Sequence, residues 1–551
     1  MSVSSSLLYS AAQPTSFTPW NISLSFITIW IIRLFYRVNR SAARKRDYSR
    51  FSDSNRCAPT TAMPKIFLGS IRHKVNLLLY PGGDLLDNVY ATKFKKYGST
   101  HALYDRYGVP VVIHTTDPVN LNAVLSKSSA HWGPSKSRAC TMYPLAQDGL
   151  LNSEGEAWHR NRKLILRHLH NKHIKDVKNA EGDIELLFDA IGPFKQDGWT
   201  GVVDLLDLFH RMSLDISTSF LLGTSANSQV NGMRNVTIQA AIDEFGLRRG
   251  RMDSKMSYDE AYEIVRHYYS MRSKLGSKYW MADSLTYRQA CDTLNSFADD
   301  LIKQAIARSK RAANTSDEPS SRFGLIDSLI KEIGDPVQIR NLVMDLFIAG
   351  QNMSGTMAAW VFAQLEAHPD IFQRVRDEVL EKFGTEQEPL SPITWDGLRS
   401  CTTMQHVILE TLRMYPLLAN IGRNAKCNTV LPRGGGKDGM QPIAVPKGAA
   451  VTCNIYLVHR REAEWGPDAW EFRPDRWVDK KLGPEYAPFG AGPRVCIGQQ
   501  MTMSEISYLL ARMMQRFSEI KAPEGQDNLT KGYRVVIAPK NGVKVRLRRA
   551  A

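Results

Sequence analysis

The sequence predicts a mainly helical fold with a minor β-sheet, and three observations support this fold class. Apolar residues make up 43% of the 551 residues, which is enough to build a large core. An apolar run between Pro336 and Pro369 predicts a helix long enough to cross a whole domain. Patterns typical of strands are few and short. Because no repeat or long linker follows residue 64, we expect one large domain over 64–551.

The N-terminal segment 17–36 is predicted to be a transmembrane signal anchor. It is apolar over roughly the 20 residues that cross a bilayer core, and only Asn21 and Arg33 are strongly polar. Basic residues prevail in the linker 37–63, which the positive-inside rule places in the cytosol. We therefore expect a lumenal tail over 1–16, a single-pass anchor and a cytosolic body. The alternatives are a cleaved signal peptide, which the lack of a cleavage motif disfavours, and an ordinary buried helix.

Hydrophobic periodicity predicts further helices around the long central one, which begins at Asp335-Pro336 and spans 335–369. These helices cover 156–170, 202–222, 259–275, 283–311, 370–383, 398–414 and 501–517. Short strands are expected over 100–104, 110–114 and 448–456. A final hairpin over 534–547 is expected to turn at Asn541-Gly542, a pair typical of tight hairpins.

Charge and cysteine content narrow the function classes. The net charge of +16 indicates acidic partners or simply a soluble basic surface. The sequence has no metal-finger spacing, no basic helix with heptads and no interleaving of arginine, glycine and aromatic residues, so we do not expect nucleic-acid binding. Seven widely separated cysteines are not typical of a disulfide framework, so we expect the body to lie in a reducing compartment.

The segment 489–498 places a single cysteine at the end of a glycine-rich loop, just before a predicted helix. A helix N-terminus and free backbone N–H groups stabilise a thiolate, and glycines let the backbone approach a flat ligand. The alternative is an ordinary structural thiol. The ten-residue pattern nevertheless resembles the cysteine loop of the cytochrome P450 family at six positions, namely Phe489, Gly490, Gly492, Arg494, Cys496 and Gly498.

The resemblance to this family extends over most of the body. Glu410 and Arg413 are similar to the family's Glu-x-x-Arg helix, and Arg476 lies in a segment, 472–477, that is similar to its partner loop. The resemblance implies that these three residues form a buried ion network that holds the cysteine loop, which is a structural role.

Other matching positions concern a cofactor. Trp158 and Arg162 lie one helical turn apart, as in the family's helix that binds a haem propionate, and Arg423 matches a further propionate ligand. The resemblance implies the cytochrome P450 fold, with a long central helix over haem b. It also implies Cys496 as the axial iron ligand, with Trp158, Arg162, Arg423, Phe489, Arg494 and Gly498 around the cofactor.

The activity implied by the resemblance is the insertion of one oxygen atom from O₂ into an apolar substrate. No flavin or nicotinamide domain accompanies it, so electrons must come from NADPH through NADPH-cytochrome P450 reductase, with cytochrome b5 as a further candidate partner. The implied location is the endoplasmic reticulum membrane. A haem-thiolate isomerase, dehydratase or peroxide-using enzyme is the rival, and a non-catalytic haem-binding protein is the third hypothesis.

The central helix departs from the family pattern where an acid and an alcohol normally stand. The segment 349–354 reads Ala-Gly-Gln-Asn-Met-Ser, which keeps the small pair but places Asn352 and Met353 at the acid and alcohol positions. Neither side chain relays protons as a carboxylic acid and a hydroxyl do. Gly350, Asn352 and Ser354 remain the candidate catalytic residues of this helix, and Ser354 requires a local distortion to serve. Ordered water or a substrate hydroxyl is the alternative proton source.

A narrower resemblance concerns the substrate. Residues 423–477 are similar to the fungal branch that hydroxylates alkanes and fatty acids, although Asn428 stands where Asp is more usual. A long-chain aliphatic substrate and a natural-product intermediate of secondary metabolism therefore both remain open.

Overall fold

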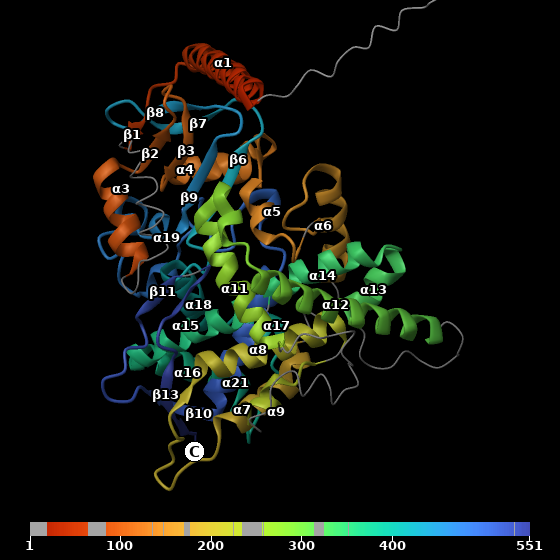
Figure 1. Cartoon of the computed structure of the whole chain (residues 1–551). Helices are drawn as coiled ribbons and strands as arrows, with labels where there is room; N and C mark the ends of the chain where they lie inside the picture. Colours follow the sequence, from red (N-terminus) through yellow and green to blue (C-terminus); the bar gives the residue numbers. More distant parts are fainter. Residues whose placement is uncertain are drawn as a thin grey trace, which may run out of the picture.

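The computed structural model describes residues 19–63, 84–134, 136–146, 148–169, 177–223, 225–233, 256, 258–312, 324–350, 352–533 and 535–550. Helices make up most of it, and the strands of the largest sheet gather at one end of the body, at the top of Figure 1. The predicted mainly helical class with a minor sheet is confirmed.

The largest sheet has six strands in the order β1-β2-β3-β9-β6-β4. Its strands are β1 (Thr61–Ala62), β2 (Thr100–Tyr104), β3 (Pro110–Thr115), β9 (Ala450–Asn454), β6 (Asn420–Ala425) and β4 (Trp132–Gly133). The two strands predicted first, over 100–104 and 110–114, are confirmed. The strand predicted over 448–456 is shorter, because Asn454 accepts a hydrogen bond at 2.8 Å from the Leu457 N–H and so begins helix α19 (Ile455–Val458).

Smaller sheets complete the β-structure of the described residues. They are β10 (Phe517–Lys521) with β13 (Lys544–Arg549) and β5 (Val203–Asp204), β11 (Lys531–Tyr533) with β12 (Ile537–Pro539), and β7 (Thr429–Gly435) with β8 (Gln441–Val445). The hairpin predicted over 534–547 is wrong, because β12 pairs with β11 whereas β13 pairs with β10 and β5. Asp204 determines this arrangement: its carboxylate accepts from the Val543 N–H at 2.9 Å and lies where a Cβ on Gly542 would have to stand.

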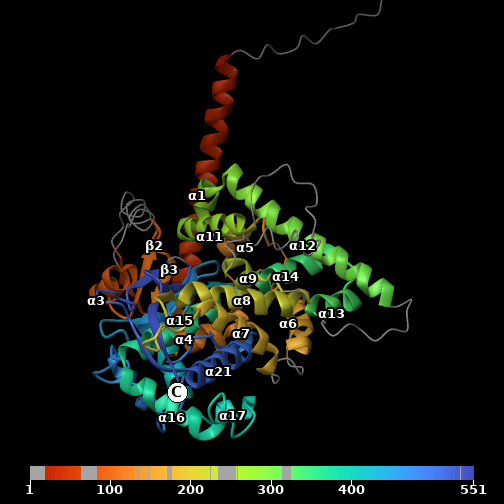
Figure 2. The same cartoon turned by 90° about the horizontal axis from the view of Figure 1, so that it is seen from below.

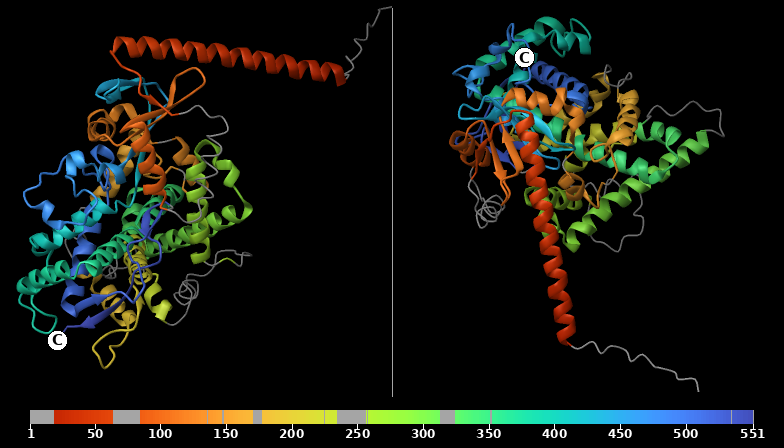
Figure 3. Two further views of the ribbon diagram at one scale, coloured as in Figure 1. Left: turned by 90° about the vertical axis from the view of Figure 1, so that its left-hand side faces the viewer. Right: turned by 90° about the horizontal axis from the view of Figure 1, so that it is seen from above.

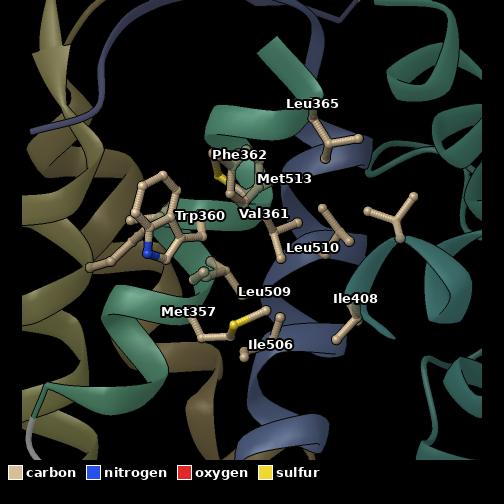
Figure 4. Packing of buried hydrophobic residues seen from close by; sticks show 14 of the residues in the cluster. Met357, Trp360, Val361, Phe362, Leu365, Ile408, Ile506, Leu509, Leu510 and Met513 are labelled. Carbon is tan, nitrogen blue, oxygen red and sulfur yellow. The ribbon is translucent and has the colours of Figure 1, made fainter. Parts of the chain in front are cut away.

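The predicted central helix is interrupted. Its two parts are α14 (Pro336–Gly350) and α15 (Met353–Ala367), and Asn352 between them has φ −118° and ψ 0°, which is not helical. Every residue from Gly355 to Leu365 is buried, so α15 lies in the middle of the main core. Figure 4 shows Met357 and Val361 of α15 beside Ile506 and Leu510 of α21 (Gln499–Arg516).

Most of the other long helices match the prediction closely. They are α6 (Gly155–Leu169), α8 (Leu205–Leu222), α11 (Tyr258–Leu275), α12 (Leu285–Ala312), α16 (Pro369–Phe383) and α18 (Thr402–Met414). Helix α7 (Glu181–Ile191) was not predicted. The helix predicted over 398–414 is divided, since α17 (Trp395–Arg399) ends before α18 begins. Shorter elements are η1 (Leu86–Ala91), α3 (Thr92–Tyr97), α4 (Pro118–Asn122), η2 (Ala123–Lys127), η3 (Ser129–His131), α5 (Lys136–Met142), η4 (Val177–Ala180), α9 (Ser228–Met233), η5 (Gly276–Ala282), α13 (Leu325–Glu332), α20 (Glu462–Trp465), η6 (Pro474–Trp477) and η7 (Gly492–Arg494).

The N-terminal helix α1 (Pro19–Ser54) leads away from the body, as Figures 2 and 3 show. It includes most of the predicted anchor and continues through the first part of the predicted linker, while β1 joins the last part of that linker to the large sheet. Residues 17 and 18 and the predicted tail 1–16 lie outside the described residues. A search of the described helices for a stretch both apolar and long enough to cross a membrane finds none.

Candidate active site

The cysteine loop folds so that Cys496 lies at its tip, directly before α21. The Cys496 N–H donates to the Phe489 carbonyl oxygen at 2.9 Å, which closes the loop. Gly490 and Gly492 have φ of 75° and 68°, a conformation that favours glycine. A Cβ on Gly492 would also overlap the backbone at Leu125, so this position needs glycine for two independent reasons.

Burial of the Cys496 sulfur acts on its pKa in one direction, and the nearby charge and hydrogen bonds act in the other. Surrounding protein desolvates the thiol, and this burial raises its pKa. Backbone N–H groups of Gly498 and Gln499 at the start of α21 and the positive charge of Arg162 act in the opposite direction. The thiol is still accessible to a ligand, because Cys496 is exposed. A cation bound at the sulfur would complete the stabilisation of the thiolate.

The structure brings three predicted cofactor residues together around one ring. Trp158 is buried on α6, with the Arg494 guanidinium 4.4 Å and the Arg162 guanidinium 5.7 Å from its ring centroid. Arg494 also donates to the Ser153 carbonyl oxygen at 2.9 Å. The cysteine loop and α6 therefore share one cationic wall.

A fourth cation, Arg138 of α5, joins this wall and was missed in the sequence, where it carries no motif. Burial and the charges of Arg138 and Arg494 lower the pKa of Arg423 on β6 to about 10. In the part of the chain that the structure describes, Arg138, Arg162, Arg423 and Arg494 form no ion pair within 4 Å, and Glu154 is the acid whose charge acts favourably on Arg494. Mutually repelling, partly buried cations require an anion, and the two propionates of haem are suited to meet them.

The remaining predicted positions fit a flat cofactor. Gly498 has no heavy atom within 4 Å of the place where a Cβ would stand, whereas Phe489 packs against the main core from the edge of the loop. On α14, Ala349 is exposed although it belongs to an interior helix. The nearest atom to a Cβ on Gly350 is the Ser217 Oγ at 3.8 Å, so the small pair leaves room at this helix.

The predicted ion network is present and fully buried. The Glu410 carboxylate accepts two hydrogen bonds from Arg413, both at 2.9 Å, and one from Arg476 at 2.8 Å. The Trp477 indole N–H and the Arg473 backbone N–H also donate to it, at 3.0 and 2.9 Å. Every lone pair of this carboxylate is therefore used, which is the condition for burying an ion pair without a large cost.

Two residues that carry no recognisable sequence signal connect this network to the cysteine loop. His459 is buried and accepts at Nε2 from the Ala487 N–H at 3.0 Å, while its Nδ1 lies 3.1 Å from the Arg413 carbonyl oxygen. Burial lowers the pKa of His459 to about 3, so the ring stays neutral, as acceptance at Nε2 requires. Tyr486 donates to the Leu409 carbonyl oxygen at 3.0 Å. Residues 486 and 487 are thus fastened directly before the loop begins.

The candidate catalytic residues Asn352 and Ser354 have separate surroundings, because the central helix is interrupted between α14 and α15. The Asn352 amide lies 3.5 Å from the Tyr262 hydroxyl of α11. Ser354, one residue beyond Met353, has its Oγ 2.8 Å from the Ser213 Oγ of α8. The helix is therefore interrupted directly before Met353 and Ser354, and Asn352 and Ser354 contact different partners rather than forming one relay.

Three features together define a haem-thiolate protein. They are an exposed cysteine in a glycine loop before a helix, a group of partly buried arginines that form no ion pair within 4 Å, and a small pair in an interrupted central helix. A comparison with family models gives a match to cytochrome P450 over residues 70–546. The chain belongs to the cytochrome P450 family, whose members are monooxygenases with haem b as cofactor.

Curated relatives agree with this family over most of the chain. Cytochrome P450 monooxygenase g430 of a Fusarium species is 31% identical over 438 residues, covering 79% of this chain and 75% of the relative. Cytochrome P450 monooxygenase milC of Cordyceps militaris is 30% identical over 530 residues, covering 95% and 98%. Cytochrome P450 52A1 of Candida tropicalis is 31% identical over 418 residues, covering 75% and 74%. These relatives are fungal.

Proposed function

We propose that this protein is a membrane-bound monooxygenase that hydroxylates or oxidises an apolar substrate with O₂ and electrons from NADPH. The observation that carries the proposal is the cationic wall of Arg138, Arg162, Arg423 and Arg494 beside the Cys496 loop, because it suits a dianionic cofactor with a thiolate ligand. Haem supplies the activation of dioxygen when bound. The chain's own residues would hold its propionates, provide the sulfur ligand and keep the loop rigid.

Two substrate classes fit, and a different observation favours each. The resemblance of residues 423–477 to the alkane and fatty-acid branch supports a long-chain aliphatic. The replacement of the acid and alcohol by Asn352 and Met353 supports a natural-product intermediate of secondary metabolism, which brings polar groups of its own. Both classes share an apolar body, and specificity is decided by the contacts that each makes.

The electron donor in this proposal is NADPH-cytochrome P450 reductase, with cytochrome b5 as a second donor. Support comes from α6, which turns Trp158 inward while its Arg160 and Lys163 are exposed. A basic surface next to the cofactor residues suits an acidic partner and predicts that electron transfer slows as salt is raised.

The experiment that tests the function combines this chain with the reductase. Lipids and extracted metabolites are offered, and products are identified by mass spectrometry with and without NADPH. NADPH-dependent product containing one oxygen atom from labelled O₂ supports the proposal. Turnover without NADPH would instead favour a haem-thiolate isomerase, dehydratase or peroxide-using enzyme. Haem binding with no turnover on any substrate would favour a non-catalytic role.

The proposed location is the endoplasmic reticulum membrane, with residues 17–36 as a single-pass anchor and the domain 64–551 in the cytosol. Support comes from α1, because the apolar side chains of Ile27, Trp30 and Phe35 are each more than half exposed. Deleting residues 1–36 is expected to release much of the protein from membranes, with some association left through the basic segment. A full-length protein that is already soluble on fractionation would contradict the anchor.

A further inference from the structure

Arg272 of α11 is a buried cation whose guanidinium is surrounded by backbone carbonyl groups. Its side chain is 1% exposed. It donates to the Cys140 and Thr141 carbonyl oxygens of α5 at 2.9 and 3.0 Å, and to the Tyr143 carbonyl oxygen just beyond α5 at 2.9 Å. It also donates to the Ala282 carbonyl oxygen at the end of η5, at 3.3 Å. One side chain therefore fastens α11, α5 and η5 to one another.

The end of α5 is electrostatically suited to a buried cation. Carbonyl groups in the last turn of a helix have no donor within the helix and form the negative end of its dipole. The ion pair between Arg272 and Asp283 is long by comparison, 3.7 Å from Nη1 to Oδ1, and Asp283 lies 2.9 Å from the exposed Arg288. A planar guanidinium serves several carbonyl oxygens at once, which an ammonium group does less well. The position therefore favours arginine over lysine.

Tyr287 of α12 holds the same end of α5 from a second side. This side chain is fully buried, and its hydroxyl donates to the Tyr143 carbonyl oxygen at 3.2 Å. Its ring centroid lies 4.7 Å from the Arg272 guanidinium carbon, a distance that favours a cation–π contact. Helices α11 and α12 pack against each other, and α11 lies beside α5, as Figures 1 and 2 show. The pair of helices α11 and α12 therefore determines where α5 lies.

The position of α5 in turn determines the position of Arg138, which lies three residues before Thr141 on the same helix. The Thr141 hydroxyl donates to the Arg138 carbonyl oxygen at 2.8 Å. Burial, and with it the charge of Arg138, lowers the pKa of Arg423 and that of Arg494. Arg138 thus contributes to the cationic wall, while the hydrogen bonds from Arg272 reach the same turn of α5.

We propose that Arg272 is a positioning residue for the cofactor: by holding the end of α5, it keeps the Arg138 guanidinium at the propionate edge of haem. The inference rests on the cationic wall described under the proposed function. Without Arg272, carbonyl groups in the last turn of α5 lose buried donors, and leaving them unpaired is costly. The turn then shifts to regain hydrogen bonds with water, and Arg138 moves with it.

The first test measures whether Arg272 holds α5, by amide hydrogen exchange in the full chain with haem bound. Arg272→Gln should raise exchange within residues 136–142 severalfold. Tyr287→Phe removes a hydroxyl and keeps the ring, so it should raise exchange less. Arg288→Gln is the matched control, because it breaks a shorter, exposed pair with the same Asp283, and it should leave exchange in α5 unchanged. Unchanged exchange in both Arg272→Gln and Tyr287→Phe would overturn the proposal.

The second test measures whether the effect passes through Arg138. Arg272→Gln and Arg138→Gln should each speed the transfer of haem to excess apomyoglobin. Each should also lower the midpoint potential of the bound haem, because a positive charge near the iron favours its reduced form. If α5 is the link, the double variant should differ little from Arg138→Gln alone, since Arg272 then has no cation left to position. Arg288→Gln should change neither quantity.

A merely structural role of Arg272 would give effects that add to those of Arg138→Gln, and this outcome would overturn the proposal. A faster transfer in Arg272→Gln with no change in Arg138→Gln would also overturn it, while leaving the monooxygenase function intact. Failure of that function would appear instead as the absence of NADPH-dependent product, which neither test measures. If Arg272→Gln does not fold, Tyr287→Phe takes its place in the double-variant comparison.

Discussion

Glu410 and Arg413 face each other one helical turn apart on α18, joined by two hydrogen bonds of 2.9 Å, and neither side chain is exposed to solvent. The same carboxylate binds Arg476, so one negative charge holds two buried cations. The pair therefore stabilises the fold only as a complete unit, since removing one member leaves the others buried without compensation.

Glu410→Gln is expected to destabilise the protein by about 3–5 kcal/mol, because Arg413 and Arg476 lose their shared anion. The measurement is the urea midpoint together with haem content. Glu464→Gln is the matched control: it breaks a pair with Arg461 of the same spacing and 2.8 Å length, but that pair is partly exposed and should cost at most about 1 kcal/mol. Equal effects of the two substitutions would contradict the structural role.

Cys496→Ser is expected to abolish the reduced carbon-monoxide spectrum of a thiolate-ligated haem, because a neutral hydroxyl does not replace an anionic sulfur. Cys401→Ser, at a buried cysteine packed in the main core, is the control and should keep the spectrum if the variant folds. A Cys496 variant that retained the spectrum would show that the axial ligand is another residue.

Arg138→Gln and Arg423→Gln are each expected to weaken haem binding and to stabilise the haem-free protein. Each should speed the transfer of haem to excess apomyoglobin, since one propionate partner is lost. Each should also stabilise the haem-free protein, because the remaining arginines repel one another less. Arg160→Gln, at an exposed position on α6, should do neither. If Arg138→Gln changes neither quantity, Arg138 does not belong to the cationic wall.

The free energy of unfolding should fall in acid, because the buried ring of His459 resists protonation in the folded protein. Its pKa is about 3 in the fold, whereas an unfolded histidine has a pKa of about 6.5. The unfolded chain therefore binds the proton more readily between these values, so this stability is complete above about pH 6.5 and is lost as the pH falls toward 3. In His459→Gln, urea midpoints measured between about pH 7 and about pH 4.5 should depend less on pH. His267→Gln, at an exposed histidine of α11, should behave like the native protein.

Restoring the missing pair by Asn352→Asp with Met353→Thr should improve the yield of product per NADPH on simple fatty acids, because proton delivery then no longer depends on the substrate's own groups. The same change should harm the native reaction, since losing Met353 opens space and adds polar surface over the cofactor. Identical coupling in all variants, on fatty acids and on the native substrate, would show that neither position governs proton delivery.

The sequence by itself determined those parts of the site whose residues are neighbours along the chain. The cysteine loop, the Glu410 and Arg413 turn and the Trp158 and Arg162 turn are local patterns, because each depends on helical spacing or on glycine conformations within a few residues. For the same reason most long helices were predicted within a few residues of their ends. The interruption at Asn352 was anticipated only as a requirement for Ser354.

Tertiary structure decided what depends on distant segments. The predicted terminal hairpin failed because Asp204, far away in the sequence, holds the turn at Gly542 and directs β13 to β10 and β5. Arg138 and His459 carry no motif, and each gains its role only from partners on other elements. Burial and charge at such positions are sums over the whole fold, so no local pattern in the sequence contains them.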